Sequence, residues 1–265
     1  MSKFLISDEI IQSVIGITKK AGAVIMDVYK TNFNIHIKND KSPVTEADTG
    51  ANDIITAGLL KIAPDIPILS EEGRDIPFKE RSKWESFWLV DPLDGTKEYL
   101  KKNDEFTVNI AYMRDNQPVF GVVYAPALDV LYWGSREKGA FKSIAGESFN
   151  PIRVKSQLNN PIQIATSRSH PSSKMDKFLS QFDSFDLHPM GSSLKICSVA
   201  DGTVHYYPRL GPTMEWDTAA SHAVIKAAGG ELIKYGTNLS LEYNKEDLLN
   251  PEFIAGNMNA IELLN

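Results

Sequence analysis

The residues with the clearest potential for chemistry lie in one short stretch of the chain, residues 88–96. Three large apolar residues, Trp-Leu-Val, indicate the end of a buried strand, and Pro92 and Gly95 indicate that the backbone then turns. Asp91 and Asp94 stand three positions apart on this turn. Because loop side chains are not hidden in a core, we expect both carboxylates to point at one spot beyond the strand.

Oxygen ligands gathered at one spot are typical of metal sites. Carboxylates as close as those of Asp91 and Asp94 repel one another, and one takes up a proton unless a cation lies between them. Pro92 has no N–H and helps to leave the carbonyl of Leu93 free to face the same spot. Mg²⁺ prefers such hard ligands and keeps waters for chemistry. The stretch predicts a Mg²⁺ site, while an ordinary Asx turn explains the same residues equally well when they are taken alone.

A second strand end repeats this pattern. Residues 66–70 predict a short apolar strand, and Glu71, Glu72 and Gly73 follow it directly. Two strand ends that carry carboxylates can converge if the strands are neighbours in one sheet. Because Glu71 and Glu72 are consecutive, they point in different directions, and we expect one of them, Glu71, to be a ligand. An exposed acidic pair is the alternative, and it suits Glu72 better.

Two more acids lie where helices are expected to begin. Asp48 opens a predicted helix that runs to about residue 62, and Asp217 opens another that ends at a Gly-Gly pair. Thr45 and Asp48 are spaced as in a capping box, so Asp48 could simply accept backbone N–H groups, and Asp217 could likewise be an N-cap. The functional alternative is that Asp48 accepts a proton from a water and that Asp217 completes the metal site.

The spacing of apolar residues elsewhere in the first half predicts the helices and strands that position these acids. Apolar residues at helical spacing predict an amphipathic helix over residues 7–30, and alternation predicts a strand over residues 34–38. The segment 143–151 is the expected boundary between two halves. After the central turn, an antiparallel meander is predicted over residues 106–112, 119–124 and 130–133.

The second half alternates strands with helices. Residues 161–165 predict a strand and residues 172–182 a helix, and a further short strand is expected just before residues 206–209. The run Gly191-Ser192-Ser193 opens a short helix through Val199, with Lys195 on its first turn. Helix N-termini carry free N–H groups and a partial positive charge, which suits a phosphate. A plain serine N-cap is the alternative and, for this segment alone, the commoner case.

Composition narrows the class of protein. The chain has 265 residues, of which 42% are hydrophobic and 23% charged, as in a globular protein with a sizeable core. The net charge of −6 and the lack of a basic run argue against nucleic acid as a partner, although metal ions still allow a small anionic substrate. The single cysteine, Cys197, cannot form an internal disulfide, and no segment is apolar over the length of a membrane span. We expect a cytoplasmic protein without an integral membrane segment.

Taken together, residues 40–48, 69–73, 88–99 and 216–230 resemble the inositol monophosphatase superfamily of Mg²⁺-dependent, lithium-sensitive phosphatases. The motifs Asp-Pro-Leu-Asp-Gly-Thr and Trp-Asp-x-Ala-Ala stand in the family's order, and the resemblance covers nearly the whole chain. It implies an α+β fold, a layered αβαβα sandwich of the inositol monophosphatase and sugar phosphatase type. An N-terminal α+β metal-binding half is then expected over residues 1–150, and a C-terminal α/β substrate-binding half over residues 151–265.

The resemblance also assigns roles to the acids. Asp91 is expected to bridge two Mg²⁺ ions that clamp the attacking and leaving oxygens, and Glu71 could reach a third, weaker ion through water. Asp48 and the Thr96 hydroxyl would orient and deprotonate the attacking water. The metal ligands implied by the resemblance are Glu71, Asp91, Asp94, Asp217 and the carbonyl of Leu93.

The motifs Ser-Arg-Ser-His, Gly-Ser-Ser-Leu-Lys and Tyr-Pro-Arg more narrowly resemble the bacterial 3′(2′),5′-bisphosphate nucleotidases. These enzymes remove the 3′-phosphate from 3′-phosphoadenosine 5′-phosphate. Inositol phosphatases carry an acid shortly before Trp-Asp, whereas this chain has Arg209, which would pair with a second phosphate. Arg168 is either an additional contact or a solvated surface residue, and Glu72 and Glu215 have no assigned role. Substrate contacts are implied for Glu71, Leu93, Asp94, Gly95, Thr96, His170, Ser192, Lys195, Arg209 and Asp217.

The sequence therefore favours a Mg²⁺-dependent enzyme that converts 3′-phosphoadenosine 5′-phosphate to AMP and phosphate. An inositol monophosphatase or broad sugar phosphatase is the first alternative, and Arg209 argues against it. A non-catalytic nucleotide sensor is the second, and such a protein would have lost Asp48 or Thr96. Bacterial members of the family are sometimes placed peripherally on the inner face of the inner membrane, and no anchor in this sequence explains such a location.

Overall fold

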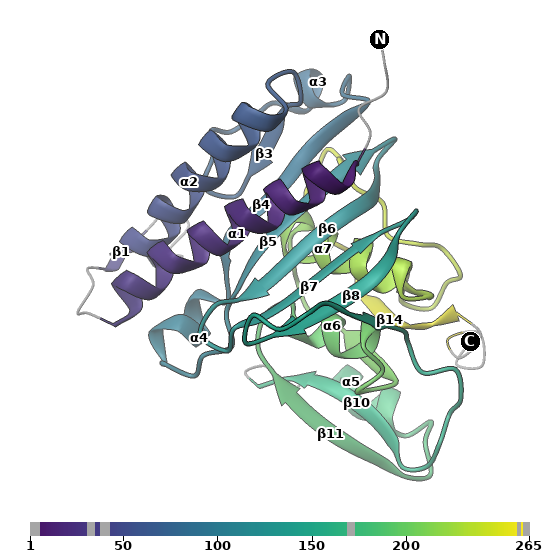
Figure 1. Ribbon diagram of the computed structural model, residues 1–265. Helices are drawn as coiled ribbons and strands as arrows, with labels where there is room; N and C mark the ends of the chain where they lie inside the picture. Colours follow the sequence, from purple (N-terminus) through teal and green to yellow (C-terminus); the bar gives the residue numbers. More distant parts are fainter. Residues whose placement is uncertain (1–5, 31–34, 38–42, 169–172, 259–260, 262–265) are drawn as a thin grey trace.

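The N-terminal part of the chain builds the larger of two main β-sheets (Figure 1). The computed structural model of the protein describes residues 6–30, 35–37, 43–168, 173–258 and 261. Strands β3 to β9 form a seven-stranded sheet in chain order, with β3 parallel to β4 and the other neighbours antiparallel. The elements are α1 (Asp8–Tyr29), β1 (Ile35–Ile37), β2 (Pro43–Thr45), α2 (Glu46–Ile62), β3 (Ile68–Ser70), α3 (Phe78–Arg81), β4 (Ser86–Asp94), α4 (Thr96–Leu100), β5 (Thr107–Arg114), β6 (Gln117–Ala125), β7 (Val130–Ser135), β8 (Gly139–Ile144) and β9 (Asn150–Ile152).

The C-terminal part builds a second, mixed sheet of five strands in the order β11-β10-β12-β14-β13. β10 is parallel to both β11 and β12, and β14 is antiparallel to β12 and β13. Its elements are β10 (Ile162–Ser167), α5 (Ser173–Leu179), β11 (Phe185–Met190), α6 (Leu194–Ala200), β12 (Tyr206–Arg209), α7 (Glu215–Ala227), β13 (Gly230–Lys234) and β14 (Phe253–Asn257).

Three hydrophobic cores hold these elements in five layers. The first core lies between the helix pair α1 and α2 and one face of the seven-stranded sheet. The second lies between the other face of that sheet, the helices α6 and α7, and the five-stranded sheet. The third lies between the five-stranded sheet and α5. The order helix, sheet, helix, sheet, helix confirms the αβαβα sandwich that the sequence led us to expect.

Local sequence pattern predicts most of the N-terminal elements correctly. The apolar stripe of residues 7–30 forms α1, the helix after Thr45 forms α2, and the predicted meander forms β5, β6 and β7. The predictions omit the short helices α3 and α4 and the strands β2, β8, β9, β11, β13 and β14. Residues 206–209 prove to be a strand rather than the segment after one. The Thr45 side chain, on which the capping-box alternative depends, lies outside the described part of the structure.

The central stretch differs from the prediction in one important respect. β4 does not end at Val90 but continues to Asp94, with a shift of register between Asp91 and Asp94 that forms a bulge. A bulge accommodates Pro92, because the residue that lacks an N–H then falls outside the regular ladder. Asp91 pairs with Asn109 of β5 and is 1% exposed, so it lies in a buried strand rather than on a solvated turn.

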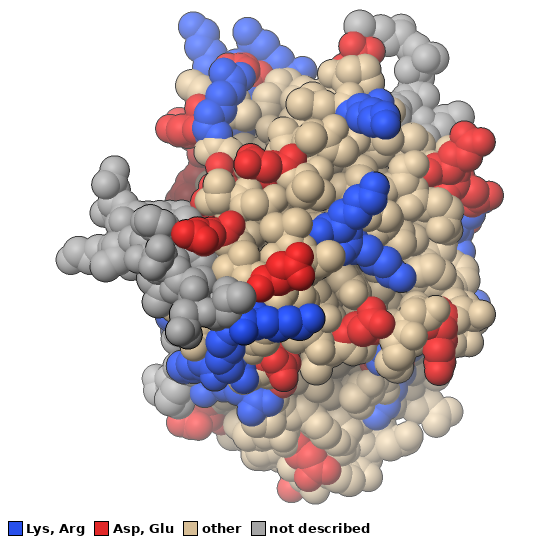
Figure 2. All heavy atoms as spheres, turned by 60° about the vertical axis from the view of Figure 1, so that its left-hand side comes forward, with Lys and Arg blue, Asp and Glu red and all other residues tan. Residues whose placement is uncertain are grey.

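The described surface shows no single dominant charge on the face formed by α1 and α2. Figure 2 shows acidic and basic side chains interspersed over this face, which is the left-hand side of Figure 1. None of the helices in the described part of the chain combines the length and hydrophobicity that crossing a bilayer requires.

Glycines allow α7 to lie directly on the seven-stranded sheet. A Cβ atom at Gly121 of β6 would lie 2.3 Å from the carbonyl oxygen of Ala220, and one at Gly134 of β7 would lie 2.7 Å from the Cα of Val224.

The second core, between the two main sheets, contains residues from both sides of residue 150, and β9 ends just beyond that point. The division of the chain into halves at residue 150 remains a prediction.

We predict that Gly121→Ala destabilises the protein, because the added methyl group meets the backbone of α7 rather than a movable side chain. Overpacking of a core typically costs about 1–3 kcal/mol. Urea denaturation would measure the change in the free energy of unfolding. Gly16→Ala is the matched control, because nothing lies within 4 Å of its Cβ position in α1, and we expect a gain of up to about 1 kcal/mol. Equal stability of the two variants would contradict this packing argument.

Candidate active site

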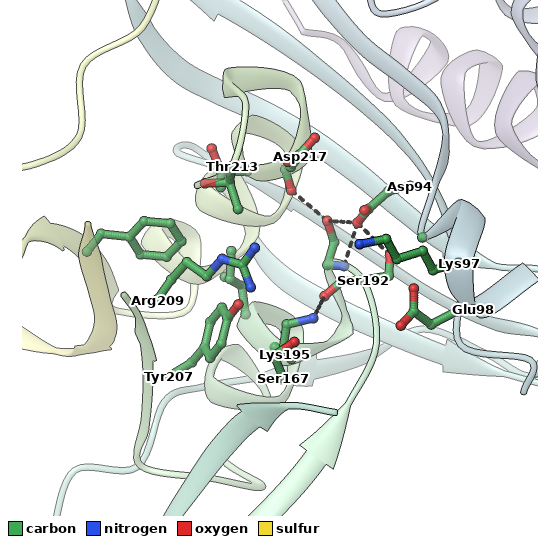
Figure 3. A pocket seen from close by; sticks show the side chains of 15 residues that line it. Asp94, Lys97, Glu98, Ser167, Ser192, Lys195, Tyr207, Arg209, Thr213 and Asp217 are labelled. Atoms are coloured by element: carbon green, nitrogen blue, oxygen red, sulfur yellow. Dashed lines mark hydrogen bonds between the residues drawn. The ribbon is translucent and has the colours of Figure 1, made fainter. Parts of the chain in front are cut away.

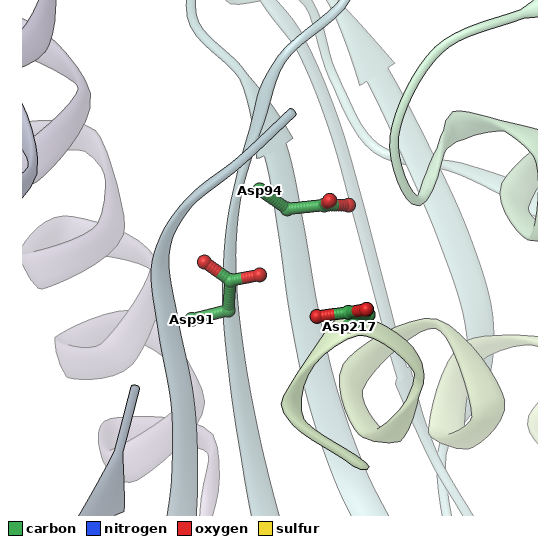
Figure 4. A group of neighbouring side chains, drawn as sticks. All are labelled: Asp91, Asp94 and Asp217. Atoms are coloured by element: carbon green, nitrogen blue, oxygen red, sulfur yellow. The ribbon is translucent and has the colours of Figure 1, made fainter. Parts of the chain in front are cut away.

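Three carboxylates from distant parts of the chain converge where β4 meets α7. Oxygen atoms of Asp91, Asp94 and Asp217 all lie within 4.8 Å of one another (Figure 4). The first two come from the bulge of β4, and the third comes from the first turn of α7. The structure thus brings Asp217 to the central stretch, as the sequence led us to expect.

The pairing of β3 with β4 places a fourth acid beside the three. The strands are parallel, with Ser70 opposite Val90, and the N–H of Glu71 donates to the carbonyl of Val90 at 3.1 Å. Glu71 is close enough for its charge to act on both Asp91 and Asp217. The two strand ends are therefore neighbours in one sheet, which is the condition for their carboxylates to converge. Glu72 follows at the same strand end and is partly exposed.

Asp48 and Thr96 lie in the first turns of two helices, α2 and α4. Asp48 is in the first turn of α2, is 3% exposed, and contributes to the electrostatic environment of Asp91. Thr96 is the first residue of α4, and it follows Gly95, whose φ of +89° turns the chain away from β4. The bulge that positions Asp91 and Asp94 thus leads directly into the helix that carries Thr96.

A backbone N–H group fixes one carboxylate oxygen of each acid in the triad. The bonds hold Oδ1 of Asp91 at 3.1 Å, Oδ2 of Asp94 at 2.7 Å and Oδ2 of Asp217 at 2.9 Å. Asp217 is not the N-cap of α7, which is Met214, but its carboxylate accepts the Met214 N–H from the third helical position, as in a capping box. One carboxylate oxygen of each acid thus accepts a hydrogen bond from the backbone, and the other oxygen can bind a ligand. The donors are Leu93, Ser193 and Met214.

Burial and mutual repulsion make this group of acids unstable as free anions. Burial, followed by the charges of Glu71, Asp94, Asp217 and Asp48, raises the pKa of Asp91 well above its usual value. Burial and the charge of Asp94 raise the pKa of Asp217 in the same direction. A divalent cation reverses this situation, because its charge favours the ionised form of each ligand. A set of oxygen donors without nitrogen or sulfur fits a hard cation such as Mg²⁺, Mn²⁺ or Ca²⁺.

The second half of the chain reaches Asp94 through the turn before α6. In addition to the Ser193 N–H, the hydroxyls of Ser192 and Ser193 lie 2.5 Å and 3.0 Å from Oδ2 of Asp94. Sequence reasoning predicts Ser192 as a substrate contact and gives Ser193 no role. A pair of serines at a helix start was the available signal, but its acceptor lies 99 residues away in the chain. The role of Ser192 as a substrate contact stays a prediction.

A pocket opens beside the acids and contains the predicted basic residues (Figure 3). The amino group of Lys195 is buried, donates to the Ser192 carbonyl at 2.7 Å and lies 5.5 Å from the centre of the Tyr207 ring. Burial lowers the pKa of Lys195 to about 8. Arg209 lies with Tyr207 on the side of the pocket that is across from Asp94 and Lys97, and its Nη2 donates to the Pro212 carbonyl at 2.7 Å. Of the predicted substrate contacts, those that line this pocket are Asp94, Gly95, Ser192, Lys195, Arg209 and Asp217.

The structure explains two residues that had no clear role. Glu215 is fully buried and accepts from the N–H groups of Asn244 at 2.6 Å and Lys245 at 3.1 Å, with the Lys245 amino group 2.5 Å away. It therefore ties the chain at residues 244–245 to the start of α7. Arg168 is paired with Glu105 rather than simply solvated. His170, a predicted substrate contact, lies outside the described residues.

Comparisons with known proteins give one consistent result. Residues 7–265 match the inositol monophosphatase family. The chain is 43% identical over 249 residues to a protein of Salmonella typhimurium named 3′(2′),5′-bisphosphate nucleotidase CysQ, a match that covers 92% of this chain and 98% of that protein. It is 42% identical, with the same coverage, to the Escherichia coli K12 protein of that name.

Solved structures agree with the sequence matches. The crystal structure of CysQ from Bacteroides thetaiotaomicron, described as a bacterial member of the inositol monophosphatase family, superposes with a TM-score of 0.83 at 38% identity. That match covers 93% of this chain and 96% of the other. An IMPase from Thermotoga maritima superposes with a TM-score of 0.76 at 25% identity, over 97% of this chain and 95% of the other.

We predict that Asp91→Asn stabilises the metal-free protein at neutral pH. The pKa of Asp91 is raised in the folded state, so its protonation favours folding. The corresponding stability is complete below the unfolded pKa of about 3.9 and is lost as the pH rises through the folded pKa. In EDTA, the free energy of unfolding of the parent should therefore fall relative to that of Asp91→Asn as the pH is raised from about 4 to about 8.

Urea denaturation at several pH values would measure this difference, with the exposed Asp53→Asn of α2 as control. A saturating divalent cation should reverse the order of the two proteins, since only the parent keeps the full ligand set. A difference that does not vary with pH would count against buried repulsion at Asp91.

Proposed function

The chain belongs to the inositol monophosphatase family, and from this premise we propose that it is a metal-dependent 3′(2′),5′-bisphosphate nucleotidase. Its reaction is hydrolysis of the 3′-phosphate of 3′-phosphoadenosine 5′-phosphate to give AMP and phosphate. The observation that carries the proposal is a triad of converging carboxylates beside a pocket lined by the buried Lys195 and by Arg209. The name of the 43% identical relative supports the choice of substrate.

The acids of β4 and α7, with Glu71 directly after β3, suit a site for Mg²⁺. One ion would be held by Glu71, Asp91 and the carbonyl of Leu93, and a second by Asp91, Asp94 and Asp217. The second oxygens of the triad are the ones left for this purpose, because backbone N–H groups hold the first. Bound divalent ions supply a nucleophilic water at neutral pH and stabilise the charge that develops on the leaving oxygen.

The residues of this chain orient the attack and take up the proton. Asp48 is buried beside Asp91, so its carboxylate is a base shielded from bulk solvent. The Thr96 hydroxyl, at the start of α4, would hold the water so that its proton passes to Asp48 and its oxygen approaches phosphorus in line with the leaving 3′-oxygen. Because both residues are present, a nucleotide sensor without catalytic activity is the weaker hypothesis.

The basic side of the pocket favours a substrate with two phosphates. The Arg209 Nε is buried and has no hydrogen-bond partner in the described part of the chain, so an anion at this position would provide one. Lys195 is buried on the same pocket, and Lys97 lies at its wall. An inositol monophosphate has no second phosphate to satisfy these groups. We therefore place the 5′-phosphate and the nucleoside toward Arg209 and Lys195, with the 3′-phosphate at the acids.

A panel of phosphomonoesters with titrated Mg²⁺ tests the proposal. We predict phosphate release from 3′-phosphoadenosine 5′-phosphate in preference to inositol 1-phosphate, and its loss in EDTA. Asp91→Asn should lower kcat/KM by about 100-fold or more, because the metal contributes several kcal/mol to transition-state stabilisation. Asp53→Asn is the surface control. A clear preference for inositol 1-phosphate would support the alternative activity, and no release with Mg²⁺ would refute the proposal.

Arg209→Gln tests the position of the second phosphate. We expect KM for 3′-phosphoadenosine 5′-phosphate to rise about tenfold or more, since a hydrogen bond to a charged group contributes roughly 1.5–3 kcal/mol. The KM for 3′-AMP, which lacks the 5′-phosphate, should change little. If Arg209→Gln impaired both substrates equally, the side chain would have a structural role or would serve the 3′-phosphate.

A further inference from the structure

Glu105 connects segments of the chain that lie close to the candidate site, because it binds both Arg168 and Gly191. Neither the sequence motifs nor the proposed mechanism gives it a role. Its Oε2 accepts the N–H of Gly191 at 2.8 Å and the Nε–H of Arg168 at 2.9 Å, while its Oε1 accepts from Nη2 of Arg168 at 2.7 Å. Two segments of the second half, the residue that follows β10 and the turn before α6, are thus bound by one carboxylate from the loop between α4 and β5. The Glu105 side chain is 17% exposed, so it is partly shielded from solvent.

The backbone of Glu105 also lies so close to Gly191 that a side chain there would clash with it. A Cβ atom at Gly191 would lie 2.6 Å from the Glu105 carbonyl oxygen, and one at Gly95 would lie 3.3 Å from the same atom. The next residue, Ser192, has a φ of +53°, a left-handed conformation that is uncommon for a residue with a side chain. The turn therefore keeps an uncommon backbone conformation while its Gly191 packs against the backbone of Glu105. Ser192 and Ser193 have further contacts with β5, through Thr107 and Asn109.

The same turn holds the metal-site acid on its other side. Ser192 Oγ and the Ser193 N–H contact Oδ2 of Asp94 at 2.5 Å and 2.7 Å. Every hydrogen bond that Asp94 accepts from the described residues goes to Oδ2, which leaves Oδ1 for a cation. A continuous series of contacts thus runs from Arg168 through Glu105 and the turn to Asp94.

We propose that Glu105 is a positioning residue for the metal site. By binding the Gly191 N–H and Arg168 together, it fixes the turn at residues 191–193, and the turn fixes the orientation of Asp94 toward the cation. Residues that orient metal ligands without touching the metal commonly affect metal affinity by 10–100-fold. The proposal rests on the proposed function only for its kinetic readout, because metal binding can be measured without a substrate.

Titration of the whole protein with Mn²⁺, followed by the electron paramagnetic resonance signal of the free ion, tests the proposal directly. Glu105→Gln keeps the size of the side chain, but its amide N–H₂ faces donors, so the three bonds cannot all form. We expect its dissociation constant for Mn²⁺ to rise about tenfold or more. Glu80→Gln is the matched control, because Glu80 also pairs with an arginine, Arg74, at 3.1 Å but on the exposed α3 side of the molecule.

Arg168→Gln keeps the proposal testable if Glu105→Gln folds poorly, because Arg168 is 46% exposed. This variant leaves the bond between Glu105 and the Gly191 N–H intact. We therefore expect a smaller rise in the dissociation constant for Mn²⁺, of about two- to fivefold, as for the loss of a partly exposed ion pair. Saturating metal should restore most of kcat in both variants. A lower melting temperature with the parent's Mn²⁺ affinity would show a purely structural role and overturn the proposal. If the parent binds Mn²⁺ but releases no phosphate, the proposed function fails while the role of Glu105 stands.

Discussion

Negative charge concentrated in a buried place is the constraint on which this structure depends. Oxygen atoms of Asp91, Asp94 and Asp217 lie within 4.8 Å of one another, and Asp91 is almost completely excluded from solvent. Such a group is unfavourable without a counter-ion, because desolvation and repulsion both oppose ionisation. The rest of the fold must therefore hold the acids in place while leaving part of each carboxylate available. Rigid elements achieve this, with two acids on a bulged strand and one on the first turn of a helix.

Each acid in the triad is held by a hydrogen bond from the backbone, and this division of its two oxygens links stability to function. The bond to Asp217 caps α7, and the bond to Asp91 stabilises the bulge of β4. The bond to Asp94 is different, because its donor belongs to the turn before α6 in the other half of the chain. Correct formation of the ligand set thus requires α6 and the turn before it to be packed against the seven-stranded sheet, and the core between that sheet and the five-stranded sheet provides this packing.

The opposite side of the pocket carries positive charge under a similar constraint. The amino group of Lys195 is buried and has a lowered pKa, and Arg209 has a buried Nε without a partner among the described residues. Buried donors of this kind are costly until an anion binds, and so they discriminate against ligands that lack one. Carboxylates that require metal ions and basic side chains that require an anion therefore line the same pocket. A phosphate ester with a second phosphate satisfies both at once.

The sequence by itself determined the elements whose pattern is local and the residue types that could bind a metal. The 3.6-residue period of α1, the alternation of β5 to β7 and the spacing of Asp91 and Asp94 depend on neighbours in the chain, so they can be read directly. Tertiary structure alone decided that β4 continues through Pro92, because pairing with β5 tolerates a bulge there. It also decided that Glu215 anchors a distant loop, that Ser193 holds Asp94, and that Glu105 joins β10 to the turn before α6. These roles depend on which buried charges and donors meet across long separations in the chain, and no local pattern records such meetings.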